Sequence, residues 1–349
     1  MIFEAEDFDD HEQTVFFCDA DSGLKAIIAI HSTALGPAAG GCRFYPYANE
    51  QDAVRDVLRL SKGMTLKNAM AGLPLGGGKA VIIADPVAGK SPALMQAMGR
   101  AVEKLGGQFI TGEDVGTSAK DMVEIRKETS HVLGLPVNEG GSGDPSPSTA
   151  RGVLEGIKAA AKHRLHKDTL EGLTIAVQGL GHVGSTLAGL LAEEGVKLIV
   201  CDMNETAVEW AGSDLGAQAV PSEVIYDAEA DIFAPCAMGA ILNANTIPRL
   251  KASIVAGAAN NQLATAADGA ALRERSILYA PDYVINAGGI IQLSAERTGE
   301  TEEAVMARLR AIGGTLTAIF EAAGMQELPT SEAADRIAAQ RILAANSAV

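Results

Sequence analysis

The sequence predicts an α/β protein of two domains, the first built on a mixed sheet and the second on a doubly wound parallel sheet. Two observations support this prediction. Short apolar runs typical of strands alternate with helical runs along the 349 residues, and a stretch rich in Gly, Pro and Ser at residues 139–148 interrupts that pattern. We therefore expect one domain over residues 1–140 plus 330–349 and another over 145–329, with a cleft between them that closes about the 139–148 stretch.

The elements follow from local patterns. In the first domain, buried strands are predicted over 26–30 and 80–84, and helices over 50–64 and 91–105, where apolar residues recur at helical spacing. In the second domain, the pattern predicts a helix over 149–163, strands over 173–177 and 197–201 each followed by a helix, further strands over 231–234, 253–256 and 283–285, and an Ala-rich helix over 302–320. A last Ala-rich helix is predicted over 331–346. We expect the last helix to return to the first domain.

Composition excludes several classes of protein. The formal net charge of −16 disfavours binding to nucleic acid, because the chain repels phosphate backbones. The four cysteines are far apart and have no metal-ligand spacing, so we expect no metal site, no disulfide framework and a cytoplasmic location. Residues 173–192 carry no charge, but three close glycines interrupt them, and they are interpreted as strand, turn and helix rather than as a membrane span.

The string VQGLGHVG supplies a G-x-G-x-x-G pattern directly after a predicted strand and before a predicted helix. Its glycines allow a tight turn and close approach of a pyrophosphate to the helix N-terminus, and Asp202 follows at the end of the next strand, near the spacing expected for a ribose-binding acid. A carboxylate there repels a 2′-phosphate, so NAD is predicted in preference to NADP in a Rossmann-like domain. The cofactor contacts expected in this motif are Gly179, Leu180, Gly181, His182, Val183, Gly184 and Asp202.

Residues 62–82, KGMTLKNAMAGLPLGGGKAVI, form the most unusual string of the first domain. Three consecutive glycines, 76–78, are expected to break helix or strand and to let the backbone approach a ligand. A phosphate-binding P-loop is excluded, because positions 73 and 80 are Leu and Ala. We predict instead that Lys67 and Lys79 lie close together, so that one ammonium binds a carboxylate while the other, desolvated and repelled, acts as a base. Solvated surface lysines are the alternative.

Acidic residues follow another strand-like run in FITGEDVGT. Adjacent residues of a strand point to opposite faces, so only one of Glu113 and Asp114 can face a given cleft. Capping of a helix that starts near Ser118 is the alternative. The six histidines form no catalytic or metal-binding group, which leaves lysine for general-base work.

Taken together, these strings resemble the Glu/Leu/Phe/Val amino-acid dehydrogenases, in particular the leucine and phenylalanine branch. The resemblance covers nearly the whole chain and includes LGPAAGGCR, KGMTLKNAM, LGGGKAVI, TGEDVGT, DPSPSTARG, DIFAPCAMGAILN, VAGAANNQL and YAPDYVINAGGII. It implies reversible, NAD-dependent oxidative deamination of an L-amino acid to its 2-oxo acid and ammonia, and a homo-oligomer, either dimer or octamer.

The resemblance also implies roles for single residues. Lys79 is expected to be the catalytic base that activates water, Asp114 to exchange protons with the amino group, and Lys67 to bind the substrate carboxylate with help from the backbone at Gly40. Asn260 and Asn261 are expected to line substrate and nicotinamide, and further cofactor contacts are implied at Thr149, Cys236, Ala237 and Asn286.

The residues that resemble the walls of the side-chain pocket are uncharged: Ala39, Gly112, Ile290 and Leu293. An acidic substrate is therefore disfavoured. Gly112 with Leu293 resembles the phenylalanine type, whereas other strings resemble the leucine type, so phenylalanine, leucine or valine, and tryptophan all remain open. An inactive NAD-binding relative and a 2-hydroxy acid dehydrogenase are the alternatives, and the second lacks the expected histidine base.

Overall fold

A computed structural model of the chain describes residues 2–5, 7–237 and 239–347, which divide into two units. The first unit runs to Asp144 and includes Leu293–Gly299 and the segment from Ala338 onward, and the second comprises Pro145–Gln292 and Glu300–Ile337. The α/β fold class is confirmed: the first unit holds a five-stranded mixed sheet and the second a six-stranded parallel sheet. None of the described helices is long and apolar enough to cross a membrane.

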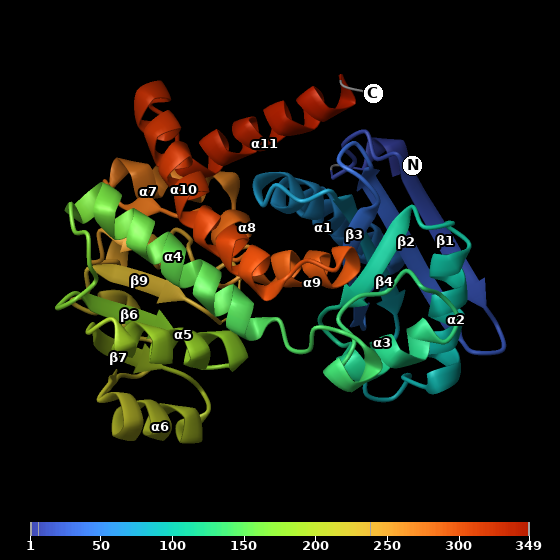
Figure 1. Cartoon of the computed structure of the whole chain (residues 1–349), viewed down its shortest axis with the longest axis horizontal. Helices are drawn as coiled ribbons and strands as arrows, with labels where there is room; N and C mark the ends of the chain where they lie inside the picture. Colours follow the sequence, from blue (N-terminus) through green and yellow to red (C-terminus); the bar gives the residue numbers. More distant parts are fainter. Residues whose placement is uncertain (1, 6, 238, 348–349) are drawn as a thin grey trace. The chain divides into compact units, whose positions relative to one another are not determined.

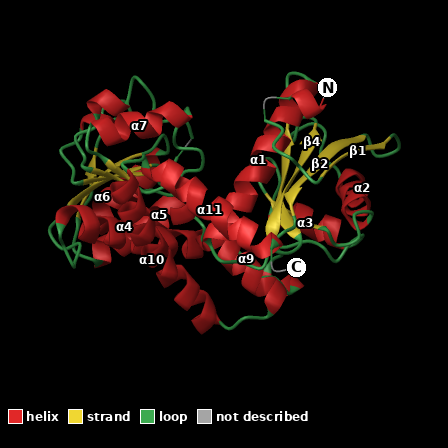
Figure 2. Cartoon of the chain, turned by 90° about the horizontal axis from the view of Figure 1, so that it is seen from above, coloured by secondary structure: helices red, strands yellow, loops and turns green. Residues whose placement is uncertain are grey.

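The first unit is a mixed sheet with helices on both faces (Figure 2). The strand order is β1-β2-β4-β3-β5, and β3, β4 and β5 run parallel. Its elements are β1 (Gln13–Asp19), β2 (Leu24–Ser32), β3 (Ala38–Tyr45), α1 (Glu50–Met70), β4 (Gly76–Ile83), α2 (Pro92–Glu103), β5 (Phe109–Glu113) and α3 (Ala119–Arg126). The sequence pattern had not predicted β1 or β3.

Alternation along the strands decides which side chains face α1. Val81 of β4 packs with Val57 and Leu58 of α1, whereas Ala80 and Ile82 belong to the core on the opposite face, with α2 and α3. Lys79 is two residues before Val81 and therefore shares its face. On β3, Arg43 is the register partner of Val81 and points the same way.

Gly76–Gly78 begin the central strand β4, so the prediction that they cannot form a strand is wrong. The space that their side chains would need is already filled: a Cβ at position 77 would overlap Thr65 of α1, and one at position 78 would lie 2.7 Å from the Phe109 ring. These glycines thus allow α1 and β5 to pack closely on β4. In the structure they serve packing within the protein, where the sequence had suggested contact with a ligand.

The second unit carries a parallel sheet in the order β11-β10-β9-β6-β7-β8, which is the order of dinucleotide-binding sheets. Figure 1 shows its central strands with α4 and α5 alongside. Its elements are α4 (Ser146–Leu165), β6 (Thr174–Gln178), α5 (His182–Glu193), β7 (Lys197–Cys201), α6 (Glu205–Leu215), β8 (Gln218–Ala219), β9 (Ile232–Pro235), β10 (Ile254–Val255), α7 (Ala266–Glu274), β11 (Leu278–Tyr279), α8 (Asp282–Ile285) and α10 (Glu302–Gln326). It also includes the first part of α9 (Gly288–Thr298) and of α11 (Thr330–Asn346), whose later residues belong to the first unit.

In this unit one strand prediction is wrong, and the helix predicted to start at residue 149 starts earlier. The run 283–285 lies in the short helix α8, because Pro281 precedes its first turn and the side chain of Asp282 accepts the backbone N–H of Tyr283. The edge strand is β11 instead, just before it. The last three residues of the predicted 139–148 hinge are already helical, since α4 begins at Ser146 with Pro147 in its first turn, where proline is favoured.

The C-terminal helix α11 ends within the first unit. The guanidinium of Arg341 donates to the carbonyl oxygens of Ala69 and Met70, each at 3.0 Å. These carbonyl groups lie in the last turn of α1, where the helix itself supplies no hydrogen-bond donor.

Candidate functional site

Among the described residues of the first unit, Lys79 is the most buried charged group and is 7% exposed. Its Nζ lies 2.5 Å from Oδ2 of Asp114, the residue directly after β5. The predicted proximity of Lys67 to Lys79 stays a prediction, and the contact that the structure shows for Lys79 is with a carboxylate. Asp114, rather than Glu113, turns toward Lys79, in keeping with the alternation of side chains along a strand.

The pair forms across an intervening strand, because β3 lies between β4 and β5. At the crossing point β3 has Gly41, whose Cβ would lie 2.6 Å from the carbonyl oxygen of Glu113 and 2.8 Å from Cβ of Asp114. The absence of a side chain at Gly41 thus lets Asp114 fold back over β3 and reach Lys79.

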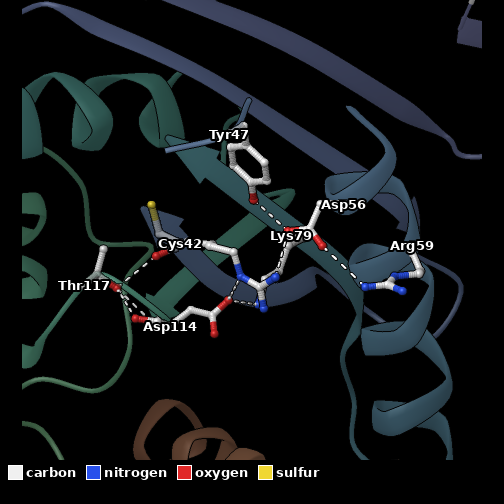
Figure 3. Close-up of polar contacts among 8 residues, drawn as sticks. Cys42, Tyr47, Asp56, Arg59, Lys79, Asp114 and Thr117 are labelled. Carbon is white, nitrogen blue, oxygen red and sulfur yellow. Dashed lines mark hydrogen bonds and ion pairs between the residues drawn. The ribbon is translucent and has the colours of Figure 1, made fainter. Parts of the chain in front are cut away.

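Asp114 is fixed on its backbone side as well. Its N–H donates to the hydroxyl of Thr117 over 2.9 Å, and that hydroxyl donates to the carbonyl oxygens of Cys42 and Asp114 (Figure 3). The helix α3 is capped by Asp121 and Ser118, so Asp114 has no capping role there. The cap alternative for Asp114 is therefore wrong.

Asp114 also binds a second cation, Arg43, whose Nε lies 3.2 Å from Oδ2. Burial raises the pKa of Asp114, but the charges of Lys79 and Arg43 outweigh it and hold that pKa below its ordinary value of 3.8. Burial and the nearby Asp114 charge raise the pKa of the neighbouring Cys42 thiol to about 12, so this cysteine is a neutral core residue.

Sequence analysis missed the polar residues behind Asp114, which are Arg43, Asp56, Tyr47 and Thr117. Arg43 lay in the quoted string LGPAAGGCR and Thr117 in TGEDVGT, and their places in these strings were the available signal.

The other predicted substrate residues of the first unit lie on β3, β5, α1 and α9. Ala39 and Gly40 are buried on β3, and Lys67 lies in the last turn of α1. Gly112 and Leu293 both lie next to residues 133–134. A Cβ at Gly112 would lie 3.6 Å from the Leu133 carbonyl oxygen, and a Cβ at Gly134 would lie 3.7 Å from Cδ2 of Leu293. Asn260, Asn261 and Ile290 belong to the second unit.

In the second unit, the glycine motif joins β6 to α5 at the point where the strand order reverses. Gly179 has a φ of 96°, and a Cβ there would lie 2.8 Å from that of Ala237. A Cβ at Gly184 would overlap the carbonyl oxygen of Gly179, so this glycine allows the helix to pack on the turn. Gly181 is the N-cap of α5, and a Cβ there would have no neighbour within 4 Å among the described atoms. Leu180, His182 and Val183 complete this turn and the start of α5.

This turn fits a dinucleotide. Because the N-cap of α5 is a glycine, it gives no side-chain cap, and the space beside it is open among the described residues. Open space at a helix N-terminus is the arrangement that binds pyrophosphate. Asp202 stands at the end of β7, with Oδ2 accepting from the Leu180 N–H over 2.5 Å and Oδ1 from that of Asn204 over 2.7 Å. The acid predicted to bind ribose thus lies directly beside the glycine turn.

The remaining predicted cofactor residues lie directly after β9, directly after α8 and at the start of α4. Cys236 follows β9, and burial raises the pKa of its thiol to about 11. Asn286 donates to Oδ1 of Asn260 over 2.7 Å and to the Ala258 carbonyl oxygen over 3.1 Å. Asn261 adopts a positive φ of 51°. Thr149 lies beside Gly289, whose Cβ would be 3.0 Å from its hydroxyl.

Two family models match the chain. The model described as Glu/Leu/Phe/Val dehydrogenase, dimerisation domain, matches residues 11–131, and the model described as Glutamate/Leucine/Phenylalanine/Valine dehydrogenase matches residues 140–217 and 204–349.

Similar proteins span nearly the full chain. A leucine dehydrogenase of Thermoactinomyces intermedius is 51% identical over 98% of this chain and 93% of its own. A phenylalanine dehydrogenase of Bacillus thermotolerans is 48% identical over 97% and 90%. Among solved structures, L-tryptophan dehydrogenase from Nostoc punctiforme matches with a TM-score of 0.85 and 47% identity, covering 96% of each chain.

Proposed function

The chain belongs to the Glu/Leu/Phe/Val dehydrogenase family and is an amino acid dehydrogenase, and we propose that it catalyses the NAD-dependent, reversible oxidative deamination of an apolar L-amino acid. The products are the 2-oxo acid and ammonia. Membership of the family implies a nicotinamide cofactor. The ion pair between Lys79 and Asp114 carries the proposal, because it places a lysine and a carboxylate at one buried point of the first unit.

Different residues of the chain are proposed to perform the separate steps of this reaction. Lys67 binds the substrate carboxylate, and the backbone at Gly40 assists it. Asp114 takes a proton from the substrate amino group, and Lys79 activates the water that attacks the carbon of the imino acid left once the Cα hydride has also departed. NAD, when bound, supplies the acceptor for the hydride that leaves Cα. It would be held by the turn from Gly179 to Gly184, by Asp202 at the ribose, and by Thr149, Cys236, Ala237 and Asn286.

The preference for NAD over NADP rests on Asp202, because a carboxylate accepts both ribose hydroxyls and repels a 2′-phosphate. The open space beside Gly181 supports a dinucleotide at this position.

The side-chain pocket is proposed to consist of Ala39, Gly112, Ile290 and Leu293, with Asn260 and Asn261 nearby. Its walls carry no charge, which favours apolar substrates over glutamate. Phenylalanine and leucine or valine are the first candidates. Tryptophan is a second candidate, since the structurally similar protein from Nostoc punctiforme is an L-tryptophan dehydrogenase.

A spectrophotometric assay of NAD reduction at alkaline pH, with leucine, valine, phenylalanine, tryptophan and glutamate, tests the proposal. We expect turnover with at least one apolar amino acid and its loss in Lys79→Ala, with the circular dichroism spectrum unchanged. No turnover with any of the five would point to an inactive relative, and near-normal kcat in Lys79→Ala would overturn the mechanism.

We also propose a homo-oligomer, a dimer or an octamer, formed through the first unit, because that unit matches the model described as a dimerisation domain. Size-exclusion chromatography with light scattering tests it, and a monomeric mass would contradict it. The cytoplasmic location stays a proposal that rests on four free cysteines.

A further inference from the structure

Behind Asp114 lies a chain of alternating charges that the proposed mechanism does not use. Arg43 of β3 contacts Asp114 through Nε and donates from Nη1 to Oδ2 of Asp56 over 2.7 Å. The hydroxyl of Tyr47 donates to the same Oδ2 over 2.6 Å. Figure 3 shows Tyr47 pointing toward Asp56, which also faces Arg59 at 3.7 Å. The order of charges is therefore Lys79, Asp114, Arg43, Asp56.

These four side chains are largely removed from water. Their side-chain exposures are 8% for Lys79, 19% for Asp114, 20% for Arg43 and 14% for Asp56. In such surroundings an ionised carboxylate needs a counter-charge, because an unpaired buried charge is costly.

Lys79 cannot serve as that counter-charge at every step, because a lysine that acts as a base exists for part of the cycle without its proton. A guanidinium keeps its proton throughout. We propose that Arg43, held in place by Asp56 and Tyr47, is a positioning residue that keeps the Asp114 carboxylate oriented, and ionised until it accepts the amino proton, whichever protonation state Lys79 is in. This inference rests on the proposed function of Lys79 and Asp114.

The geometry explains why the residue is arginine. Arg43 binds Asp114 through Nε and Asp56 through Nη1, two nitrogens in a rigid planar group. A lysine has one nitrogen and cannot hold both carboxylates in these fixed positions. The hydroxyl of Tyr47 donates to Asp56 and so helps to hold the carboxylate that binds Arg43.

The competing explanation is that Arg43 only ties β3 to α1. The two explanations differ in whether the effect of Arg43 on kcat depends on Asp114. A double-mutant cycle of the two residues measures that dependence. Arg43→Gln should lower kcat by about 10- to 100-fold with KM changed by less than about twofold, because Arg43 is not assigned to the substrate. In an Asp114→Asn background, the same substitution should change kcat by less than about twofold.

Two further variants serve as controls for this double-mutant cycle. Arg43→Lys keeps the charge and should recover part of the kcat lost in Arg43→Gln. Arg55→Gln removes an exposed guanidinium from helix α1, one that pairs with Asp7, and should leave kcat unchanged. Equal losses of kcat from Arg43→Gln in both backgrounds would overturn the inference.

The titration of Asp114 can be measured without any assay of activity. The ¹³C NMR signal of the carboxyl group in labelled aspartate reports it, and the signal of Asp114 is assigned by its loss in Asp114→Asn. Removing Arg43 removes one of two cations beside the carboxylate, so the midpoint should rise by about one pH unit or more in Arg43→Gln. An unchanged midpoint would overturn the inference. If Arg43→Gln does not fold, Asp56→Asn replaces it and should lower kcat in the same direction. An enzyme inactive on every amino acid would defeat the proposed function, while the titration would still decide the link between Arg43 and Asp114.

Discussion

Asp114 lies directly over Gly41, with a distance of 2.8 Å between its Cβ and the place where a Cβ of residue 41 would stand. Asp114 follows β5, Lys79 belongs to β4, and Gly41 lies on β3 between them. The ion pair thus depends on a residue that contributes no side-chain atom.

We predict that Gly41→Ala separates Asp114 from Lys79. The added methyl would also lie 2.6 Å from the Glu113 carbonyl, so the end of β5 must move. The expected result is a loss of kcat of at least about tenfold, since misplacement by about 1 Å can cost about 100-fold. Steady-state kinetics with circular dichroism measures it. The matched control is Gly314→Ala in α10, at an exposed position with open space, which should retain kcat and gain about 0.5–1 kcal/mol of stability.

The ionised form of Asp114 should stabilise the fold in a pH-dependent way. Its pKa is lowered in the folded protein, so its contribution is complete above the unfolded-state pKa of about 3.9 and is lost as the pH falls through the lower, folded-state value. Asp114→Asn leaves the buried Lys79 without its carboxylate and should lower the free energy of unfolding by about 3 kcal/mol at pH 7. Urea unfolding between pH 7 and pH 3 checks this. A difference between wild type and variant that does not shrink below about pH 4 would contradict it.

The two glycines at the start of α5 should respond in opposite ways to the same added methyl. Gly181→Ala places it in open space, so the melting temperature should stay within about 2 °C while NAD binding weakens by at least about tenfold, because the methyl enters the proposed pyrophosphate site. Gly184→Ala overlaps the Gly179 carbonyl and should lower the melting temperature. Thermal unfolding and NADH fluorescence titration measure both. Unimpaired binding in Gly181→Ala would argue against this site.

Substrate choice should respond to Gly112. A methyl at this position meets only the Leu133 carbonyl oxygen, at 3.6 Å, so Gly112→Ala is expected to fold normally. It narrows the proposed pocket and should lower kcat/KM for phenylalanine relative to leucine by about tenfold, the value of one methyl group in an apolar pocket. The ratio of the two kcat/KM values is the measurement. An unchanged ratio would remove Gly112 from the pocket.

Much of the second unit was determined by the sequence itself. The glycine motif needs only a strand, a turn and a helix that follow one another, and the spacing to Asp202 needs only the next strand. The short edge strands were harder to predict, because β8 and β11 have two residues each and are defined by their partners, whereas the strand predicted over 253–256 matches β10. The run 283–285 has the composition of a strand but lies in α8, where Pro281 and Asp282 set the local conformation.

Only the tertiary structure decided the surroundings of Lys79. Sequence identified Lys79 and Asp114 as candidates and resemblance gave them roles, but nothing local shows that β3 separates their strands or that Gly41 opens the way across. Arg43, Asp56 and Tyr47 are ordinary polar residues in the sequence and become one network through the sheet register and the packing of α1. A local motif reflects the backbone conformation of a few consecutive residues. A buried charge network depends instead on which strands become neighbours, and that is fixed only when the whole sheet forms.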